Sequence, residues 1–451
     1  MDEHVEAGRL HRMARLAGVA ARTTRDVIAA RAKQKLMGST DSDVGAALKP
    51  TAERLVEVLG EMKGAATKVG QFLSLVDQDG FPEEARTALT KLLNQTPKRM
   101  PWSQVQAVVA AELGQPVAAA FASFEQEPIA SASLGQVHGA TTHDGRDVVV
   151  KIQFPGVDAA IETDLRNAGT LSKALSLAGG VLDTARYYDE LAATLRRELD
   201  YREEVKQLLA YREALRPWPD LVVPDPLPEL STGKVLTLQR LRGPSMLQVA
   251  QDPDATAETR FRVGSQLVTA TWGPFLSKRV IHSDPHPGNY IVMSEGRLGV
   301  LDFGATKVLS TRFVTAYWRI LEAAFAGKRA DLLQLLLSAG FELKGDYVKT
   351  DAWLHGLGDI VERPFRQDAY DWGACRIAID VRTHARKDAL TALRLRAPEE
   401  SLMFYRSAAG AAGVLRMLKA SGDFQAVLQG VASVARQHLA PELALALDAG
   451  A

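Results

Sequence analysis

The sequence has little of what would place it in several common protein classes. It contains one cysteine, Cys375, so an internal disulfide and cysteine-based zinc sites are excluded, and a reducing compartment fits. Lys plus Arg number 54 in the 451 residues and Asp plus Glu also number 54, so the formal net charge is zero. A protein that coats nucleic acid needs many uncompensated cations, and we therefore expect no nucleic-acid partner.

Long hydrophobic runs are also absent. The most apolar uncharged stretch, from Val263 to Ser277, falls short of the roughly 18–20 residues that a membrane span needs, and it contains Gly273-Pro274. No apolar region of the secretory type follows the first basic residues. We therefore expect a cytoplasmic protein. The composition, 46% hydrophobic and 24% charged, is that of a globular protein, and the length predicts two or three domains.

The N-terminal region carries a local excess of basic residues. Residues 1–40 are rich in Arg and Lys, and Leu10, Met13, Leu16 and Val19 recur at three-residue spacing, which predicts an amphipathic helix. Such a helix can lie on an anionic membrane, which predicts peripheral contact through residues 1–40, or it can pack on its own protein. Both interpretations stay open.

Periodicity divides the rest of the chain. Helical patterns run to about residue 120, and one of these helices is expected to open after Pro101 and end at Gly114. Two strands are predicted between Pro128 and Gln153 around the turn signal Asp144-Gly145, and another from Lys234 to Leu241. We predict an α+β fold with these parts: 1–45, an amphipathic helix and loop; 46–120, a helical extension; 121–243, a small lobe with inserted helices; 244–451, a helical lobe.

The segment most informative about chemistry runs from His282 to Asn289. Asp284 and Asn289 lie five residues apart in a proline-stiffened loop, and Asp302-Phe303-Gly304 follows. Kinase-type phosphoryl transfer needs one carboxylate near the nucleophile, then an Asn and a second Asp to hold Mg²⁺ on the phosphates. Oxygen ligands suit Mg²⁺. We predict that Asp284 is catalytic and that Asn289 and Asp302 bind the metal.

A third part of the same chemistry lies upstream, in the strand that ends near Lys151. Strand alternation places Val149 and Lys151 on one face. Lys151 can then reach the α- and β-phosphates of a nucleotide while Val149 covers the adenine. Each part alone is a weak signal, but the order and spacing together indicate an enzyme that binds ATP or ADP with Mg²⁺.

At this point the sequence resembles the UbiB family of atypical, aarF-domain-containing (ADCK-type) kinases, over roughly residues 50–330. Four stretches carry the resemblance: Lys68-Val-Gly-Gln71 (the KxGQ motif), Ala130-Ser-Ala-Ser-Leu-Gly-Gln-Val-His138 (the Ala-rich loop), Glu198-Leu-Asp200 (the ExD motif) and His282 to Asn289 (HxDPHPGN). An aminoglycoside-type small-molecule kinase would explain the catalytic loop but neither the KxGQ motif nor the Ala-rich loop.

The resemblance implies a protein-kinase-like two-lobed fold with an N-terminal helical extension over the cleft. Lys68 and Gln71 would lie on that extension and, with Glu198 and Asp200, would control access to the site. The loop residues Ala130, Ser131, Ala132 and Ser133 would cover the phosphates. The family also implies a role in isoprenoid-quinone or lipid metabolism, with a lipid or quinone precursor as ligand.

The spacing of the ExD motif raises a geometric question. Residues two apart on a regular helix diverge by about 200°, so Glu198 and Asp200 cannot both face Lys151 unless the helix ends there. We expect Glu198 to pair with Lys151 or Lys68. Glu190, eight residues earlier and only about 80° round the helix, is the alternative partner of Lys151.

Three residues depart from the family pattern and bear on nucleotide affinity. Ser131 interrupts the alanines and can bond a phosphate or its own backbone, Val149 replaces a smaller residue, and Gln239 replaces a glutamate.

A zinc site at His282, Asp284 and His286 would need further histidines. We therefore expect His282 to orient the catalytic loop, and we expect His138 to be structural as well.

The segment after Asp302 limits the function. Only Gly304 to Ser310 precedes the next helical pattern, and no long activation segment follows. We therefore expect an Mg-ATP-binding atypical kinase or ATPase that does not phosphorylate proteins. Three alternatives stay open: a nucleotide-operated lipid-binding or regulatory protein, a small-molecule phosphotransferase, and a non-catalytic pseudokinase.

Overall fold

A computed structural model describes residues 99–166 and 192–449, except positions 133, 164, 194, 329, 367, 368 and 393. The predictions for residues 1–45, for most of 46–120, and for Lys68, Gln71, Ser133 and Glu190 lie outside these residues. Contacts between Cα atoms divide the chain into a first unit, Met1–Glu203 with Pro226–Gln239, and a second unit, Glu204–Asp225 with Arg240–Ala451. Each unit is described by itself.

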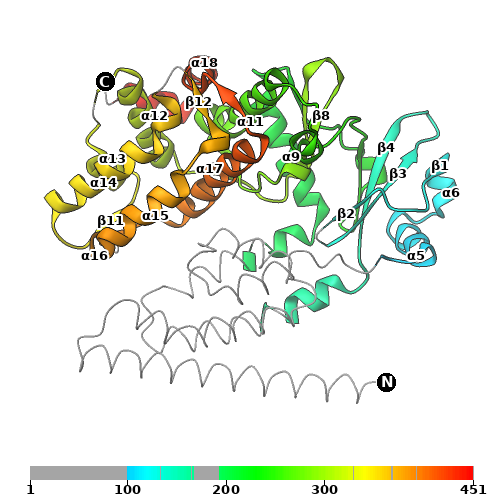
Figure 1. Cartoon of the computed structure of the whole chain (residues 1–451). Coiled ribbons are helices and arrows are strands. Elements are labelled where there is room, and N and C mark those ends of the chain that lie inside the picture. The colour runs from blue at the N-terminus through cyan, green and yellow to red at the C-terminus, as the bar shows by residue number, and fades with distance from the viewer. Residues whose placement is uncertain are drawn as a thin grey trace, which may run out of the picture. The chain divides into compact units, whose positions relative to one another are not determined.

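The first unit is built on a small antiparallel sheet (Figure 1). Its strand order is β1-β3-β4-β6, with β2 paired to β3 outside that path. The bounds are β1 Ser123–Phe124, β2 Ala130–Ala132, β3 Gly135–Thr141, β4 Asp147–Gln153 and β6 Val235–Gln239, with the helices α5 Trp102–Leu113 and α6 Val117–Ala120 and the 3₁₀ turn η2 Pro228–Leu230.

The hairpin and the helix of this unit confirm two sequence predictions. Helix α5 begins after Pro101 and ends at Gly114, whose φ of 69° is the left-handed value that glycine adopts without strain. Strands β3 and β4 pair from Gly135↔Gln153 to Thr141↔Asp147 around a turn that contains Gly145 at φ 84°. Turn chemistry and apolar periodicity were sufficient to place both elements.

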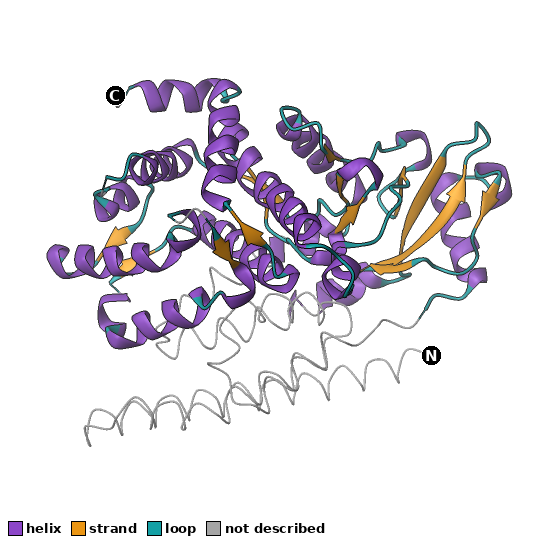
Figure 2. Cartoon of the chain, turned by 45° about the horizontal axis from the view of Figure 1, so that its top comes forward, coloured by secondary structure: helices purple, strands orange, loops and turns teal. Residues whose placement is uncertain are grey.

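Alternation along β4 sorts its side chains between two faces. Val148, Val150 and Ile152 are fully buried and pack in one cluster with Val105 and Val109 of α5. Figure 2 shows the helix beside one face of the sheet. Val149 and Lys151 are only partly buried. The sequence prediction that these two residues share the other face is confirmed.

The second unit is mainly helical, and its strands are short. Strand β7 (Val280–His282) pairs with β10 (Thr306–Val308), and β5 (Leu221–Val222), β9 (Leu298–Val300) and β8 (Tyr290–Val292) form a three-stranded sheet. Two further pairs are β11 (Glu342–Leu343) with β13 (Leu395–Arg396) and β12 (Tyr370–Asp371) with β14 (Ser421–Gly422). The helices are α9 Tyr201–Leu215, which begins in the first unit, α10 Met246–Gln251, α11 Ala257–Lys278, α12 Thr311–Phe325, α13 Leu332–Ser338, α14 Tyr347–Val361, α15 Ile377–Lys387, α16 Ala389–Ala392, α17 Glu399–Leu418, α18 Phe424–Gln437 and α19 Pro441–Asp448.

Helix α11 forms the centre of this unit. It contains the apolar stretch from Val263 to Ser277 and packs on α17, α18 and β7. Phe275 and Leu276 belong to the same buried cluster as Phe313 of α12 and Phe404 of α17. The stretch is apolar because the helix is surrounded by protein.

None of the described helices combines the length and the apolar character that crossing a bilayer requires.

Candidate active site

The candidate residues of the first unit gather at the end of β4. The Nζ of Lys151 lies 4.9 Å from the centroid of the Tyr201 ring, within the range of a cation–π contact. Two residues further along β4, the Nε2 of Gln153 donates to the carbonyl oxygen of Leu199 at 2.9 Å. Lys151 is therefore held beside the segment that carries the ExD motif.

The ExD segment answers the geometric question that its spacing posed. Glu198 is the last residue of one helical stretch, Leu199 is a turn, and α9 begins at Tyr201. Asp200 lies between the two helices, and its Oδ1 accepts the backbone N–H of Arg202 at 2.9 Å, as an N-cap side chain does. The helix thus ends between Glu198 and Asp200, and Glu198 is buried. Which lysine Glu198 pairs with stays a prediction.

The Ala-rich segment is a strand rather than an open loop. Ala130, Ser131 and Ala132 form β2 and pair with β3. Gly135 begins β3 where no side chain fits, because a Cβ there would lie 2.0 Å from the carbonyl oxygen of Ile152. Ala130 and Ser131 are exposed and Ala132 is partly buried. Their predicted contact with phosphates stays a prediction.

A buried polar chain supports this hairpin from β3. The Oε1 of Gln136 accepts the backbone N–H of Met100 at 2.9 Å, and its Nε2 lies 2.8 Å from the Nε2 of His138. The Nδ1 of His138 lies 2.8 Å from the carbonyl oxygen of Glu125. Because a carbonyl only accepts, Nδ1 carries the proton and Nε2 accepts from Gln136. Burial lowers the pKa of His138, and the contact with Glu125 offsets part of that shift. The structural role predicted for His138 is confirmed.

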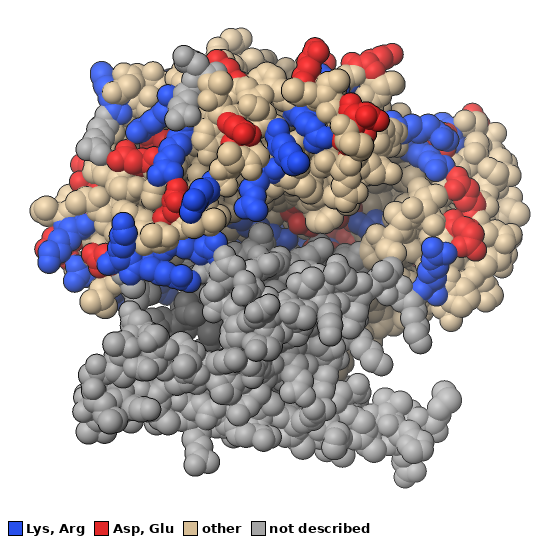
Figure 3. All heavy atoms as spheres, viewed as in Figure 1, with Lys and Arg blue, Asp and Glu red and all other residues tan. Residues whose placement is uncertain are grey.

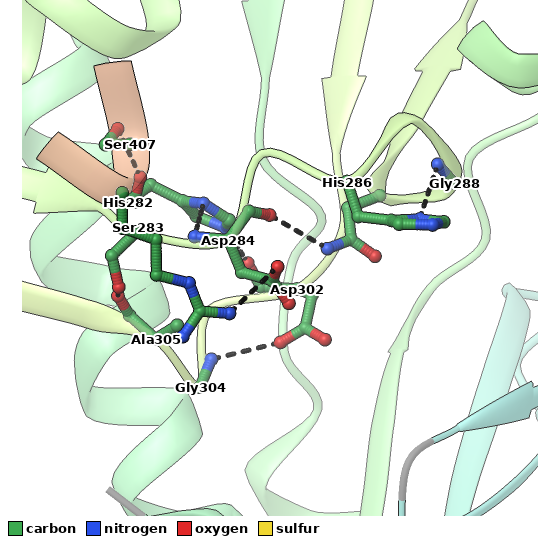
Figure 4. Close-up of polar contacts among 11 residues, drawn as sticks. His282, Ser283, Asp284, His286, Gly288, Asp302, Gly304, Ala305 and Ser407 are labelled. Carbon is green, nitrogen blue, oxygen red and sulfur yellow. Dashed lines mark hydrogen bonds and ion pairs between the residues drawn. The ribbon is translucent and has the colours of Figure 1, made fainter. Parts of the chain in front are cut away.

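In the second unit, His282 connects the two segments that carry the carboxylates (Figure 4). Its Nε2 donates to the carbonyl oxygen of Asp302, and its Nδ1 accepts the backbone N–H of Asp284 at 3.4 Å. The ring is 3% exposed and makes edge contacts with Tyr211 and Phe303. His282 therefore links the loop that carries Asp284 to the segment that carries Asp302, as predicted, and the catalytic role of this loop stays a prediction.

Helix α17 contributes two residues that the sequence did not reveal. The Nη2 of Arg406 lies 3.3 Å from the Oδ1 of Asp284, and the two side chains are only 9% and 15% exposed. The neighbouring Ser407 donates from Oγ to the carbonyl oxygen of His282 at 2.7 Å. More than 120 residues separate these partners, and no motif marks Arg406, so sequence spacing carried no signal for it.

Asn289 and Asp302 supply the oxygen atoms that a magnesium ion would bind. The Nδ2 of Asn289 donates to the carbonyl oxygen of Asp284 at 3.1 Å, which fixes the amide and leaves its oxygen as the acceptor end. The Oδ1 of Asp302 accepts the N–H of Gly304 at 3.1 Å. One amide oxygen and one carboxylate suit Mg²⁺, which keeps several waters and needs few protein ligands.

The remaining histidine of the loop points elsewhere. His286 is exposed, and its Nδ1 accepts the N–H of Gly288 at 3.1 Å. Figure 4 shows its ring directed away from Asp284 and Asp302. Among the described residues, no group of three or more His, Cys, Asp or Glu side chains is placed to hold a metal ion.

Comparison with known proteins identifies the class of protein that this arrangement defines. Residues 92–336 match the model of the ABC1 atypical kinase-like domain, which is more than half of the chain. The fold is a mixed α+β kinase-like fold, as the sequence predicted. The chain belongs to the UbiB family of ABC1-type atypical kinases.

Individual relatives agree with this assignment. The chain is 31% identical over 439 residues to the mitochondrial atypical kinase COQ8B of Danio rerio, covering 93% of this chain and 68% of that protein. It is 30% identical over 323 residues to the mitochondrial atypical kinase COQ8 of Saccharomyces cerevisiae, covering 70% of this chain and 62% of that protein. A solved structure of Rv3197 from Mycobacterium tuberculosis in complex with erythromycin is 28% identical, with a TM-score of 0.60, and covers 87% of this chain and 98% of that one.

Proposed function

We propose that the chain binds Mg-ATP and transfers or hydrolyses its terminal phosphate. Lys151 would contact the α- and β-phosphates, and Asn289 and Asp302 would hold the Mg²⁺. The observation that carries the proposal is the contact of one buried imidazole, that of His282, with the backbone of both Asp284 and Asp302. Such a contact fixes the carboxylate near the nucleophile relative to the metal ligand, and positioning is the main contribution of the protein to phosphoryl transfer.

Mg²⁺ would offset charge on the phosphates, and the chain's own residues would fix the reacting groups. Asp284 would orient the attacking hydroxyl or water and accept its proton. Arg406 holds the carboxylate in place by an ion pair in a largely buried setting. The roles assigned to Ala130, Ser131, Ala132 and Val149 around the nucleotide remain part of this proposal.

The segment after Asp302 supports a substrate other than a protein. Strand β10 pairs with β7 from Thr306↔His282 to Val308↔Val280. Immediately afterwards, the N–H and Oγ of Ser310 donate to the carboxylate of Glu400 at 2.7 and 2.6 Å. The few residues that follow the Asp-Phe-Gly triplet are thus held by β7 at one end and by Glu400 at the other. A protein kinase, in contrast, presents its substrate on a long activation segment.

The family relationship suggests a substrate class. We propose that the activity supports isoprenoid-quinone or other lipid metabolism, with a lipid or quinone precursor as ligand and peripheral membrane contact through residues 1–40. The same residues also serve a nucleotide-operated lipid-binding or regulatory protein with little phosphotransfer. Lys68 and Gln71, with Glu198 and Asp200, would regulate access to the nucleotide.

The test of nucleotide binding is Asp302→Asn. The substitution removes a charged metal ligand, so the thermal stabilisation of the chain by Mg-ATP should be lost, with apparent affinity at least about 100-fold lower. Asp254→Asn, at an exposed loop carboxylate of the same unit, is the matched control and should behave as wild type. Unchanged stabilisation of the Asp302 variant by Mg-ATP would contradict the metal assignment.

The lipid assignment needs a separate measurement. ATP hydrolysis by the full chain is measured with and without anionic liposomes that carry a phenolic quinone precursor. A rise in rate with the precursor, abolished by Asp284→Asn, is expected. Hydrolysis that is indifferent to liposomes and precursor alike would remove the support for a lipid-linked function while leaving the nucleotide site intact.

A further inference from the structure

Gln153 is a buried polar side chain beside the candidate nucleotide-binding lysine. It is the last residue of β4 and follows Lys151 by two positions, so the two share a face of the strand. Gln153 is only 1% exposed, whereas Val149 and Lys151 on that face are partly buried. Glutamine is rarely buried to this extent unless it is hydrogen-bonded, so the partners of this amide show what the position is for.

The amide of Gln153 donates to two backbone carbonyls. Its Nε2 lies 2.9 Å from the carbonyl oxygen of Leu199 and 3.3 Å from that of Gly233. Because a carbonyl oxygen only accepts, both N–H groups are used and the orientation of the amide is fixed. Leu199 directly follows the helical stretch that ends at Glu198, and carbonyls at the end of a helix have no partner within it. Gln153 supplies the donor that this helix end lacks.

The carbonyl of Gly233 connects the same amide to Tyr201. Its oxygen also accepts the backbone N–H of Tyr201 at 2.9 Å. The Tyr201 ring is the one whose centroid lies 4.9 Å from the Nζ of Lys151. A chain of contacts therefore leads from Gln153 through Gly233 and Tyr201 to Lys151, and all four residues belong to the first unit.

The oxygen of the Gln153 amide has no such role. Oε1 is buried and accepts no hydrogen bond from the described residues. A buried acceptor without a donor reduces stability, and native folds contain few of them. An aliphatic side chain would avoid that cost, so the two donors are what this position uses.

Surface charge does not single out a site for an anionic ligand. Figure 3 shows Lys and Arg side chains interspersed with Asp and Glu over the part of this face that the described residues form, and the whole chain has no net charge. Long-range attraction of a nucleotide needs a broad area of positive charge. Affinity for phosphates then depends on the placement of single cations, and Lys151 is the cation assigned to them.

We propose that Gln153 is a positioning residue for Lys151. By closing the helix end at Leu199 and holding Gly233, it fixes the Tyr201 ring beside the lysine and so sets where the ammonium group meets the phosphates. Gln153 itself would not touch the nucleotide. The inference rests on the proposed nucleotide site, and it adds to that site a residue outside the four sequence motifs.

The test is Gln153→Met, which keeps the length of the side chain and removes both donors. Isothermal titration of the full chain with Mg-ATP should show affinity about fivefold lower, because the lysine stays but is misplaced. Thr237→Val is the matched control: it removes another buried donor of the same sheet, the Thr237 Oγ1 that lies 2.6 Å from the carbonyl oxygen of Leu230. Both variants should unfold a few degrees lower, but Thr237→Val should bind Mg-ATP as wild type does.

A double-mutant cycle separates action through Lys151 from a general loosening of the fold. If Gln153 acts by placing the lysine, adding Gln153→Met to Lys151→Met should lower the affinity by less than about twofold further. Independent effects would multiply, and the double variant would then bind about fiftyfold more weakly than wild type. Such a product would overturn the proposal.

Hydrogen exchange in the nucleotide-free chain tests the geometry alone. Peptides that cover Leu199 to Tyr201 should exchange faster in Gln153→Met than in wild type or in Thr237→Val. Unchanged exchange would show that the amide does not hold the helix end, and it would overturn the proposal. If Gln153→Met does not fold, Gly233→Ala disturbs the same contacts, because its Cβ would lie 3.2 Å from the Oδ1 of Asp200. Its affinity should fall about twofold, and wild-type affinity there would contradict the chain of contacts.

The titration also separates this inference from the proposed function. If the wild-type chain binds Mg-ATP and Gln153→Met binds it equally well, the positioning role of Gln153 is wrong and the nucleotide site stands. If the wild-type chain does not bind Mg-ATP, the proposed function fails, and the positioning role fails with it.

Discussion

The two units position their candidate catalytic residues in different ways. In the first unit, Lys151 lies on a strand that is hydrogen-bonded on both sides, to β3 and to β6. In the second unit, Asp284 and Asp302 lie on loops. Side chains contribute much of what holds these loops: His282 and Arg406 act directly, and Ser407 acts through the backbone of His282. The lysine is thus placed by a backbone ladder, whereas the carboxylates depend on a few polar contacts.

This difference predicts different responses to substitution. A ladder has many equivalent bonds and tolerates the loss of one side chain, but it cannot move aside for an added atom. A network of side chains fails when one member is removed, because a buried partner is left without compensation. The substitutions below test this contrast, beginning with the largest expected effect.

Arg406→Leu should have the largest effect on stability. It removes Arg406 as a partner of the largely buried Asp284 carboxylate, and breaking such a pair costs about 3 kcal/mol. Urea denaturation of the variant gives the value. Arg406→Lys should recover part of the loss, and Arg416→Leu, at an exposed position of the same helix, should change stability by less than about 0.5 kcal/mol. A loss below 1 kcal/mol in Arg406→Leu would show that the network does not hold the loop.

Glycine-to-alanine substitutions test the other half of the contrast, which is that a strand ladder cannot make room for an added methyl group whereas a loop can. Gly135→Ala should cost about 2–3 kcal/mol, because the new Cβ meets the backbone oxygen of Ile152 at 2.0 Å and neither strand can yield. Gly410→Ala on α17 brings a Cβ within 2.5 Å of the Pro285 ring, and the catalytic loop can shift. We expect about 1 kcal/mol there, with a larger fall in ATP hydrolysis than in stability.

A third glycine serves as the control for both. Gly413, one turn further along α17, has no atom within 4 Å of the position of a new Cβ. Gly413→Ala should be neutral or stabilising by about 0.5–1 kcal/mol, because alanine is the better helix former. Equal costs in Gly135→Ala and Gly410→Ala would contradict the contrast between ladder and loop.

The sequence predicted the parts of the fold that local signals determine. Pro101 and Gly114 marked the ends of α5, Asp144-Gly145 marked the hairpin, and alternation sorted Val149 and Lys151 from the buried face of β4. The short pairs β11–β13 and β12–β14 were not predicted, because two-residue strands carry no periodicity.

The site was predicted only where motifs carry it. Asp284, Asn289 and Asp302 follow from their spacing, but Arg406 and Ser407 reach the loop from a helix more than 120 residues away, and only tertiary packing brings them there. The end of the helix between Glu198 and Asp200 could not be predicted from the sequence either. It depends on Asp200 capping α9, and the two-residue spacing of the motif gives no sign of that cap.

Lys151→Met tests the same contrast at a candidate site residue whose position depends on the backbone bonds of β4. We expect nucleotide affinity to fall about tenfold, with a smaller loss of stability than in Arg406→Leu, because the strand keeps all its backbone bonds. Isothermal titration with Mg-ATP gives the affinity. Lys234→Met is the matched control, since its half-exposed ion pair with Asp158 lies in the same unit and contributes little. A loss of stability as large as that of Arg406→Leu would show that Lys151 is a structural residue.

The smallest effect concerns pH and the buried imidazole of the first unit. Burial lowers the pKa of His138 below its ordinary value of 6.5, so the unfolded chain binds a proton at this residue more readily than the folded one. Its contribution to stability is therefore complete above pH 6.5 and declines as the pH falls from 6.5 towards the lowered folded-state value. His138→Gln should reduce this decline in urea denaturation, whereas His143→Gln, at an exposed position of the β3–β4 turn, should retain it. An unchanged decline in His138→Gln would mean that the Gln136–His138 chain accommodates a charged imidazole, and that the ladder, rather than this polar contact, holds the hairpin.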